Sequence, residues 1–272
     1  MIISASRRTD VPAFYLDWFF FRVHAGYCTV VNPRNSAQVS CVSLAPEDVE
    51  LVVFWTRDGR RLCRELAALR AYDRRLLVHW TITGYPDRLE PDNPPLHAAL
   101  EGFKALSRAL GPGRVIWRYD PIFVSNLTPP SFHVAQFQRL ATALRGYTRR
   151  CVVSLVDFYA KVDRRLRRVH GLQWDPEPAR CPAFPAMMRA IATCARSCGM
   201  EIVGCAEPEG LERFGIAPGA CIDASYIRRE LGVTVSARKD PAQRSLCRCV
   251  RSRDIGAFHT CRRRCLYCYA NR

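Results

Sequence analysis

The sequence predicts an α/β protein built on a parallel sheet, with a TIM-like barrel as the favoured architecture and an open doubly wound sheet as the alternative. Apolar, β-branched runs alternate with amphipathic helical patterns along the chain. The runs are almost continuously apolar, as expected for strands buried on both faces of a parallel sheet. A length of 272 residues with 49% hydrophobic content suits one α/β barrel. No glycine-rich phosphate-binding motif follows the first run, so neither a Rossmann site nor a P-loop is predicted.

The predicted strands and helices follow one another in a βαβα series. Six apolar runs are the expected strands: 2–6, 51–56, 76–83, 114–120, 151–157 and 201–207. Five helical patterns are expected between or beside them: 12–26, 58–72, 93–113, 131–147 and 183–200. Pro12 near the start and Gly26 just past the end mark the limits of the first helix. Because helical connections between parallel strands are right-handed, at least six such strands favour a barrel.

Polar side chains lie at the C-terminal ends of several predicted strands. In a parallel barrel the carboxyl ends of the strands meet on one face, where active sites form. The polar groups at these ends are Arg7, Arg8, Asp10, Thr56, Thr83, Arg118, Asp120, Asp157 and Glu207. Any one of them could instead cap a helix or form an ion pair at the rim, but together they predict a polar pocket. The candidates for orienting a substrate or cofactor are Arg7, Arg8, Asp10, Arg118 and Asp120.

The chain carries a formal net charge of +16, and the segment 236–272 supplies half of it. A basic patch attracts nucleic acid, nucleotides or other anions. Arginine is frequent throughout the chain, however, and a solvated basic surface explains the charge equally well. Neither a secretory signal nor a membrane span is predicted, so we expect a cytoplasmic protein.

The organisation indicates one structural unit with two parts. Residues 1–235 are the expected barrel-like domain, and residues 236–272 are a basic, cysteine-rich segment that packs on it and binds a metal cluster. The chain has 14 cysteines, and in a reducing cytosol clustered cysteines bind metal more often than they form disulfides. Outside the clusters, ordinary buried side chains are expected at Cys28, Cys41, Cys63, Cys151, Cys194 and Cys198.

The C-terminal stretch CRRRCLYCYANR holds three cysteines with the spacing C-x-x-x-C-x-x-C. Thiolates are soft ligands that suit zinc or iron–sulfur clusters. A 4Fe–4S cluster normally takes four cysteines, so Cys261, Cys265 and Cys268 would leave one iron open to a small molecule. A structural zinc site is the alternative, with His259 or Cys249 as the fourth ligand. Free thiols in so basic a loop would oxidise easily, which disfavours an unligated state.

This spacing, with the aromatic Tyr267 before the third cysteine, resembles the cluster loop of the radical S-adenosylmethionine enzymes. A much longer part of the chain resembles a bacterial family with no assigned reaction, through ISASRRTDVPAFYLDWFFFRV, VIWRYDPI and RKDPAQRSLCRCVRSRDIGAFHTCRRRCLYCYANR. That family is known chiefly for a C-terminal cysteine cluster similar to the radical S-adenosylmethionine one. The stretch YCYA is also similar to the cluster loop of the spore photoproduct lyase group.

The resemblance implies an open-iron 4Fe–4S cluster on the three tail cysteines and S-adenosylmethionine as its ligand. It also implies reductive cleavage to a 5′-deoxyadenosyl radical, Tyr267 near the adenine, and a reductant such as flavodoxin or ferredoxin. The chain departs from the superfamily in lacking a clear GGE motif and in carrying the loop at its end, whereas the loop normally follows the first barrel strand. A circularly permuted barrel would restore that geometry; otherwise the tail would fold across the barrel mouth.

Four further cysteines stand in sequence contexts similar to the same family: Cys205, Cys221, Cys247 and Cys249. Four thiolates could hold a second, fully ligated 4Fe–4S cluster or a structural zinc ion. The alternative is that Cys205 and Cys221 line the pocket or the core, while the other two support the first site.

Two functions follow from these observations. The first is a radical S-adenosylmethionine-like enzyme that acts on a small molecule or a nucleic acid in the barrel mouth, where a pocket would exclude water and shield the radical. The second is a nucleic-acid-binding protein in which the basic tail, with its metal knuckle, grips phosphates. The polar strand ends favour the enzyme, since a pure scaffold would not need them.

Overall fold

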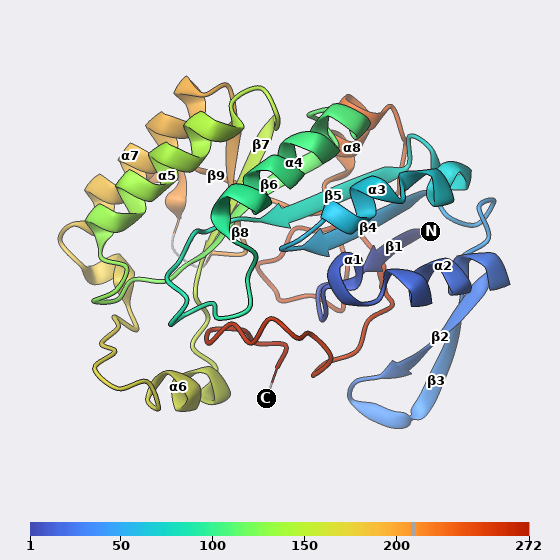
Figure 1. Ribbon diagram of the computed structural model, residues 1–272, viewed down its shortest axis with the longest axis horizontal. Coiled ribbons are helices and arrows are strands. Elements are labelled where there is room, and N and C mark those ends of the chain that lie inside the picture. Colours follow the sequence, from blue (N-terminus) through green and yellow to red (C-terminus); the bar gives the residue numbers. More distant parts are fainter. Residues whose placement is uncertain (208–209, 272) are drawn as a thin grey trace.

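Eight parallel strands form one sheet in the part of the chain that the computed structural model describes, residues 1–207 and 210–271 (Figure 1). Their spatial order is β10 (Arg253–Asp254), β1 (Ile2–Ala5), β4 (Leu51–Thr56), β5 (Leu76–Thr81), β6 (Val115–Ile122), β7 (Arg150–Leu155), β8 (Glu201–Cys205) and β9 (Ala217–Gly219). Every neighbouring pair is parallel. The predicted α/β class and parallel sheet are therefore confirmed. The sheet is open, because no pairing joins β10 to β9 within the described residues.

Most of the predicted helices are present, with changed limits. The helices are α1 (Val11–Phe14), α2 (Leu16–Ala25), α3 (Arg60–Arg64), α4 (Leu96–Leu110), α5 (Pro130–Leu144), α6 (Ala160–Leu166), α7 (Phe184–Ser197) and α8 (Ala224–Leu231). The helix predicted over 12–26 is divided at Tyr15, whose φ of −135° and ψ of 25° are not helical. Gly26 ends α2 in the left-handed region, as its position in the sequence predicts. None of the helices in the described part of the chain has the length and apolar character needed to cross a membrane.

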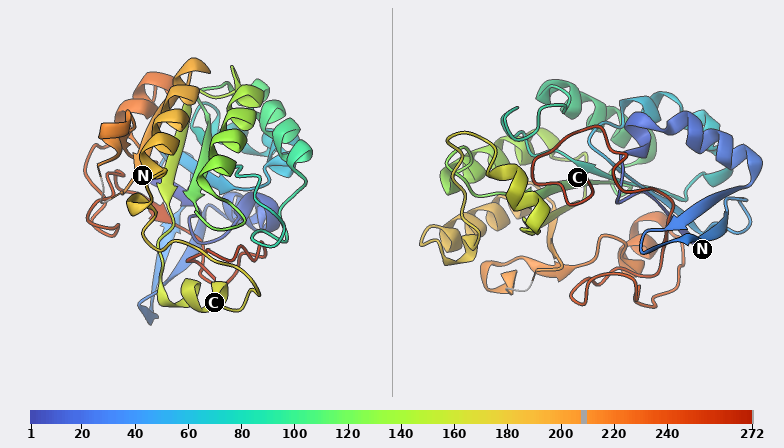
Figure 2. Two further views of the ribbon diagram at one scale, coloured as in Figure 1. Left: turned by 90° about the vertical axis from the view of Figure 1, so that its left-hand side faces the viewer. Right: turned by 90° about the horizontal axis from the view of Figure 1, so that it is seen from below.

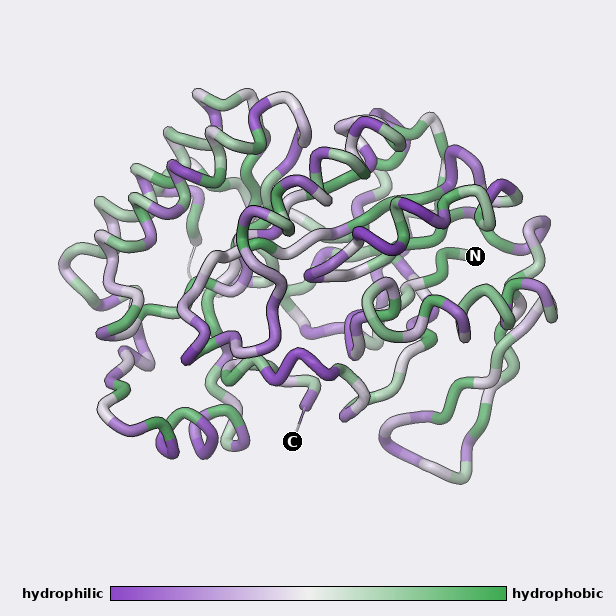
Figure 3. The backbone as a smooth tube through the Cα atoms, in the orientation of Figure 1, coloured by the Kyte–Doolittle hydropathy of each residue, from purple (hydrophilic) through white to green (hydrophobic). Residues whose placement is uncertain are grey.

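The two faces of the sheet are covered by different parts of the chain. Helices α3, α4, α5 and α7 lie over one face (Figure 1), where Phe54 and Trp117 belong to the main core. On the other face, α8 and the coil before β10 pack against Val53 and Ile116; we call this the α8 face. Side chains alternate along a strand, so a buried strand contributes to both cores. Figure 3 shows the resulting apolar strands and the strongly hydrophilic stretch near the C-terminus.

The C-terminal segment enters the sheet through β10, which lies beside β1 with Ile3 opposite Arg253. The chain then runs along the carboxyl ends of the strands, and Figure 2 shows it between α6 and the N-terminal elements. The backbone N–H of Leu266 donates to the carbonyl of Leu89 at 3.1 Å, which fixes the segment against the loop after β5.

The sequence did not predict the antiparallel hairpin of β2 (Tyr27–Asn32) and β3 (Asn35–Ser43), which forms a separate two-stranded sheet. Its outer positions face solvent, and Cys41 is exposed, so the expectation that Cys41 is buried is wrong. Of the other five cysteines expected to be buried, Cys28, Cys151 and Cys198 are buried, and Cys63 and Cys194 are half-buried.

Candidate functional site

Asp254, at the end of β10, binds the C-terminal segment to the start of the chain. Its carboxylate accepts hydrogen bonds from the hydroxyls of Ser4 at 2.9 Å and Ser6 at 2.5 Å. It also accepts from the backbone N–H of Arg7 at 2.8 Å and of Gly256 at 3.1 Å. Gly256 permits this close approach, because a Cβ there would lie 2.2 Å from the Ser6 hydroxyl oxygen. Charge-assisted bonds of this kind are strong, so the start of the cysteine loop is firmly placed.

Asp10 caps α1 and contacts the cysteine loop. Its carboxylate accepts from the N–H of Ala13 at 3.1 Å, from the N–H of Arg57 at 2.9 Å and from the Thr56 hydroxyl at 2.6 Å. Arg263, between the first two tail cysteines, lies 3.6 Å from the same carboxylate. Burial raises the pKa of Asp10, and the Arg263 guanidinium opposes that shift. Asp10 therefore holds α1, β4 and the cysteine loop together.

A buried ion pair fixes Tyr267, the aromatic residue of the cysteine motif. Glu90 is 3% exposed, lies 2.8 Å from the Arg57 guanidinium and accepts a hydrogen bond from Thr83. The Tyr267 hydroxyl donates to Glu90 and accepts from Arg57 at 2.7 Å. The ring packs edge-on against Tyr85. Sequence reasoning missed Arg57 and Glu90, because nothing in their local sequence pairs them.

The three tail thiols lie on this scaffold with different degrees of burial. Cys265 is buried, while Cys261 and Cys268 are half-buried. Burial raises the pKa of Cys265 to about 12, against the opposing effect of the Arg57 guanidinium, and burial also raises the pKa of Cys261. Arg165 of α6 donates to the backbone carbonyls of Cys265 and Cys268. The loop is thus held from both sides, by α6 and by the ends of β1 and β4.

Within the described residues, no three His, Cys, Asp or Glu side chains are grouped so that they could hold a metal ion. A single ion needs its ligands around one point, at about 2.0–2.3 Å for zinc. The cysteines of an iron–sulfur cluster bind separate iron atoms, so they stand farther apart. Cys265 interacts electrostatically with both Cys261 and Cys268. The cysteine loop therefore brings three soft donors into one region.

The structure brings the other four candidate cysteines together on the α8 face. Cys205 ends β8, Cys221 follows β9, and Cys247 and Cys249 belong to the coil before β10. The sulfur atoms of Cys205 and Cys221 are 3.3 Å apart. The Cys249 thiol is close enough to Cys221 and Cys247 to influence the pKa of both. The sequence left open whether these thiols meet, and the fold shows that they do; we call them the α8-face thiols.

Two predicted arginines flank the α8-face thiols. Arg118 donates to the Cys221 sulfur at 2.8 Å and forms an ion pair with Asp120. Arg7 and Arg118 both lie over the Trp55 ring, at 4.7 and 5.2 Å from its centroid. The Nη2 atom of Arg7 is buried and has no hydrogen-bond partner among the described residues. This region thus concentrates positive charge around the sulfur atoms.

The five predicted polar residues divide by their contacts into two groups. Arg7, Arg118 and Asp120 belong to the surroundings of the α8-face thiols. Arg8 donates to the carbonyl of Gly256 at 3.2 Å and, with Asp10, supports the cysteine loop. Sequence reasoning also missed Tyr269, whose hydroxyl donates to the Arg7 carbonyl at 2.9 Å and so connects the two groups.

Sequence comparison agrees with the predicted resemblance to a family that has no assigned reaction. Residues 2–270 match the family described as Domain of unknown function (DUF1848). The chain belongs to the DUF1848 family. No curated protein and no solved structure matches it. The match includes both groups of thiols and strand β10.

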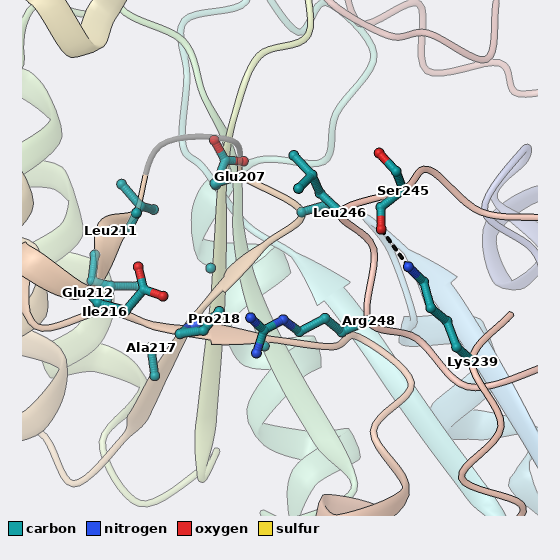
Figure 4. Close-up of a pocket in the computed structure, with 14 residues that line it drawn as sticks. Glu207, Leu211, Glu212, Ile216, Ala217, Pro218, Lys239, Ser245, Leu246 and Arg248 are labelled. Atoms are coloured by element: carbon teal, nitrogen blue, oxygen red, sulfur yellow. Dashed lines mark hydrogen bonds between the residues drawn. The ribbon is translucent and has the colours of Figure 1, made fainter. Parts of the chain in front are cut away.

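A cavity of about 360 Å³ lies at the β8–β9 edge of this DUF1848 protein (Figure 4). Glu207, Glu212, Lys239 and Arg248 contribute its charged groups. Burial raises the pKa of Glu207 to about 7, although the N–H of Leu155 donates to this carboxylate and opposes the shift. Near neutral pH the carboxyl group therefore exists in both protonation states, so it can accept or release a proton inside the cavity.

Proposed function

We propose that this DUF1848 protein is a radical S-adenosylmethionine-like iron–sulfur enzyme built on a circularly permuted partial barrel. The observation that carries the proposal is the position of β10. It is the first strand of the sheet in spatial order, β1 follows it, and the cysteine loop comes after it in the chain. In the enzymes that the motif resembles, the cluster loop follows the first barrel strand. The same spatial order is available here although the loop ends the chain.

The residues of the loop fit an open-iron cluster. Cys261, Cys265 and Cys268 would be its ligands and would leave one iron without a protein ligand. When bound there, the cluster supplies the electron that splits S-adenosylmethionine into methionine and a 5′-deoxyadenosyl radical, and a flavodoxin or ferredoxin would be a suitable reductant. The contacts of Arg263 with Asp10 hold the loop against the strand ends. The burial of Cys265 would help to keep water from the reacting atoms.

Side chains around the loop would orient the cofactor and the substrate. Arg7 is held beside the loop by the hydrogen bond that its carbonyl accepts from Tyr269, so its positive charge would attract an anionic group of the cofactor or substrate. The Tyr267 hydroxyl is already bound to Glu90 and Arg57, so contact with the adenine would involve its ring. Arg118 and Asp120 would complete the polar surroundings on the α8 face.

The proposal is tested by replacing the most buried tail thiol. Anaerobically reconstituted, reduced protein should release 5′-deoxyadenosine from S-adenosylmethionine, and Cys265→Ala should release no more than the background without protein. Cys41→Ala is the matched control, because Cys41 is exposed on the β2–β3 hairpin. Release by Cys265→Ala at the wild-type rate would contradict the mechanism.

The charges of the tail give less support to the nucleic-acid-binding alternative. Three tail arginines form ion pairs with carboxylates of the protein itself: Arg263 with Asp10 and Asp58, Arg264 with Asp92, and Arg244 with Asp157. Cations engaged in this way offer less charge to phosphates, which are the main source of salt-dependent affinity. A mobility-shift titration at low salt decides the point, since a phosphate-binding tail would retard single-stranded DNA or RNA and release it steeply as salt rises.

A further inference from the structure

The α8-face thiols come from three separate segments, yet each one contacts another. Cys205 touches Cys221 with 3.3 Å between the sulfur atoms. Cys249 accepts a hydrogen bond at 3.4 Å from the N–H of Ile222, the residue after Cys221, and it influences the pKa of Cys221 and Cys247. Cys221, Cys247 and Cys249 are buried, and Cys205 is half-buried. Four soft donors that converge in a protein interior are the ligand set of a closed metal site.

The groups around these thiols are suited to negatively charged sulfur. Arg118 donates to Cys221 at 2.8 Å, and Arg7 has a buried Nη2 without a partner among the described residues. A neutral thiol is a weak acceptor, whereas a metal-bound thiolate accepts charge-assisted hydrogen bonds. The unused buried donor of Arg7, near Cys221 and Cys249, therefore indicates an anionic centre.

We infer that Cys205, Cys221, Cys247 and Cys249 bind a second metal centre, either a zinc ion or a fully ligated 4Fe–4S cluster. In the metal-free protein the four thiols contact one another in sequence and do not surround one point. Accordingly, the described residues contain no group of side chains already placed to hold a metal ion. Metal binding releases the thiol protons, and rotation about each Cα–Cβ bond then turns the sulfur atoms toward a common centre. Arg7 and Arg118 would balance the net negative charge of a tetrathiolate centre.

The position of this centre indicates a structural role that links the two edges of the open sheet. It would join the end of β8, the loop after β9 and the coil that leads to β10, and so connect both edge strands. Metal binding of this kind contributes directly to folding free energy. The inference does not depend on the proposed radical reaction, because it concerns different cysteines and predicts a fully ligated site.

The decisive experiment removes the tail site first. The full chain carrying Cys261→Ala, Cys265→Ala and Cys268→Ala is purified anaerobically, and zinc, iron and acid-labile sulfide are measured per chain. We expect about one zinc, or about four irons with four sulfides. Zinc would identify an ion site and iron with sulfide a cluster site, and either result supports the centre. Adding Cys247→Ser and Cys249→Ser should then remove the metal.

A matched control variant and a second, spectroscopic readout show whether metal binding depends on these four cysteines. Cys194 and Cys198 also form a hydrogen-bonded thiol pair, on α7 in the other core, so Cys194→Ser with Cys198→Ser should retain the metal. Cobalt(II) added to the metal-free tail variant should give the visible bands of a tetrahedral tetrathiolate, and Cys205→Ser should shift them. The inference is overturned if the tail variant binds neither metal nor cobalt. It is also overturned if the metal persists without Cys247 and Cys249.

Discussion

The tail thiols and the α8-face thiols lie at the same end of one sheet, but they are assembled in opposite ways. The tail group is local, with three cysteines inside the short stretch from Cys261 to Cys268, and lacks a fourth thiol. The α8-face group is distributed over three segments, has four thiols, and is flanked by the guanidiniums of Arg7 and Arg118. Catalytic metal sites keep an open position and structural ones are closed. From this difference we propose that the tail carries the chemistry and the α8 face a stabilising centre.

The largest expected effect, on metal content and on cleavage of S-adenosylmethionine, comes from removing one thiol from each group. Cys265→Ala should abolish cleavage of S-adenosylmethionine and leave the second metal centre intact. Cys249→Ala should remove the second centre and leave a cofactor-dependent signal from the tail cluster, because the two ligand sets share no cysteine. Metal analysis and 5′-deoxyadenosine release, measured on both variants, check the separation. Simultaneous loss of both centres in each single variant would show that the two groups form one site.

A large loss of stability is expected from Glu90→Gln. This change leaves the Arg57 guanidinium without its carboxylate partner in the interior. It also leaves one acceptor oxygen for the hydrogen bonds that Tyr267, Thr83 and Asn93 donate to Glu90. Breaking a buried pair in this way costs about 3–5 kcal/mol, measured as the free energy of unfolding in urea. Glu101→Gln is the control, since Glu101 pairs with Lys104 on the exposed side of α4. A loss below about 1 kcal/mol would mean that the tail is not held through Glu90.

Asp254→Asn should have an intermediate effect that is concentrated in the tail. An amide cannot accept all the hydrogen bonds that the carboxylate receives from Ser4, Ser6 and two backbone N–H groups. We expect a loss of about 2–4 kcal/mol and faster proteolysis after β10 than elsewhere. Asp157→Asn serves as the control, because Asp157 is exposed and pairs only with Arg244 among the described residues. Unchanged protection of the tail would indicate that β10 does not position the loop.

The smallest effect is expected from Arg264→Ala. Arg264 lies in the cysteine loop beside Arg263, yet its ion pair with Asp92 is on the surface. Exposed pairs contribute little to stability, so thermal melting should not change measurably. Arg263→Ala should lower the melting temperature, because Arg263 is buried against Asp10 and Asp58. Equal effects from these neighbours would contradict the distinction between surface and anchoring contacts.

The comparison between the two groups of thiols also explains which features could be predicted from the sequence. The tail motif is visible because its ligands lie within a few residues, and the strands of the main sheet are visible because they are long and apolar. β10 and β9 were missed since they have two and three residues, too few for a periodic pattern. The meeting of Cys205 with Cys221 depends on how distant segments cross the sheet. Local sequence carries no signal for such contacts.

The polar residues at the strand ends were predicted to line one pocket, but in the structure they make different contacts. Asp10 is engaged as a helix cap and in an ion pair with Arg263, so its role is to position the loop. Arg118 reaches the α8-face thiols. Parallel topology places such residues at one end of the sheet, but the partner of each side chain is set by tertiary packing.

The most direct test of the central claim is electron paramagnetic resonance on anaerobically reconstituted, reduced protein, recorded with and without S-adenosylmethionine. To isolate the tail, the measurement uses the Cys247→Ser, Cys249→Ser variant beside the wild type. We expect a reduced 4Fe–4S signal in both proteins that shifts when the cofactor is added, as an open iron on the tail cysteines requires. A cluster signal that does not change when the cofactor is added, or no iron signal at all, would contradict the proposal that this protein is a radical S-adenosylmethionine-like enzyme.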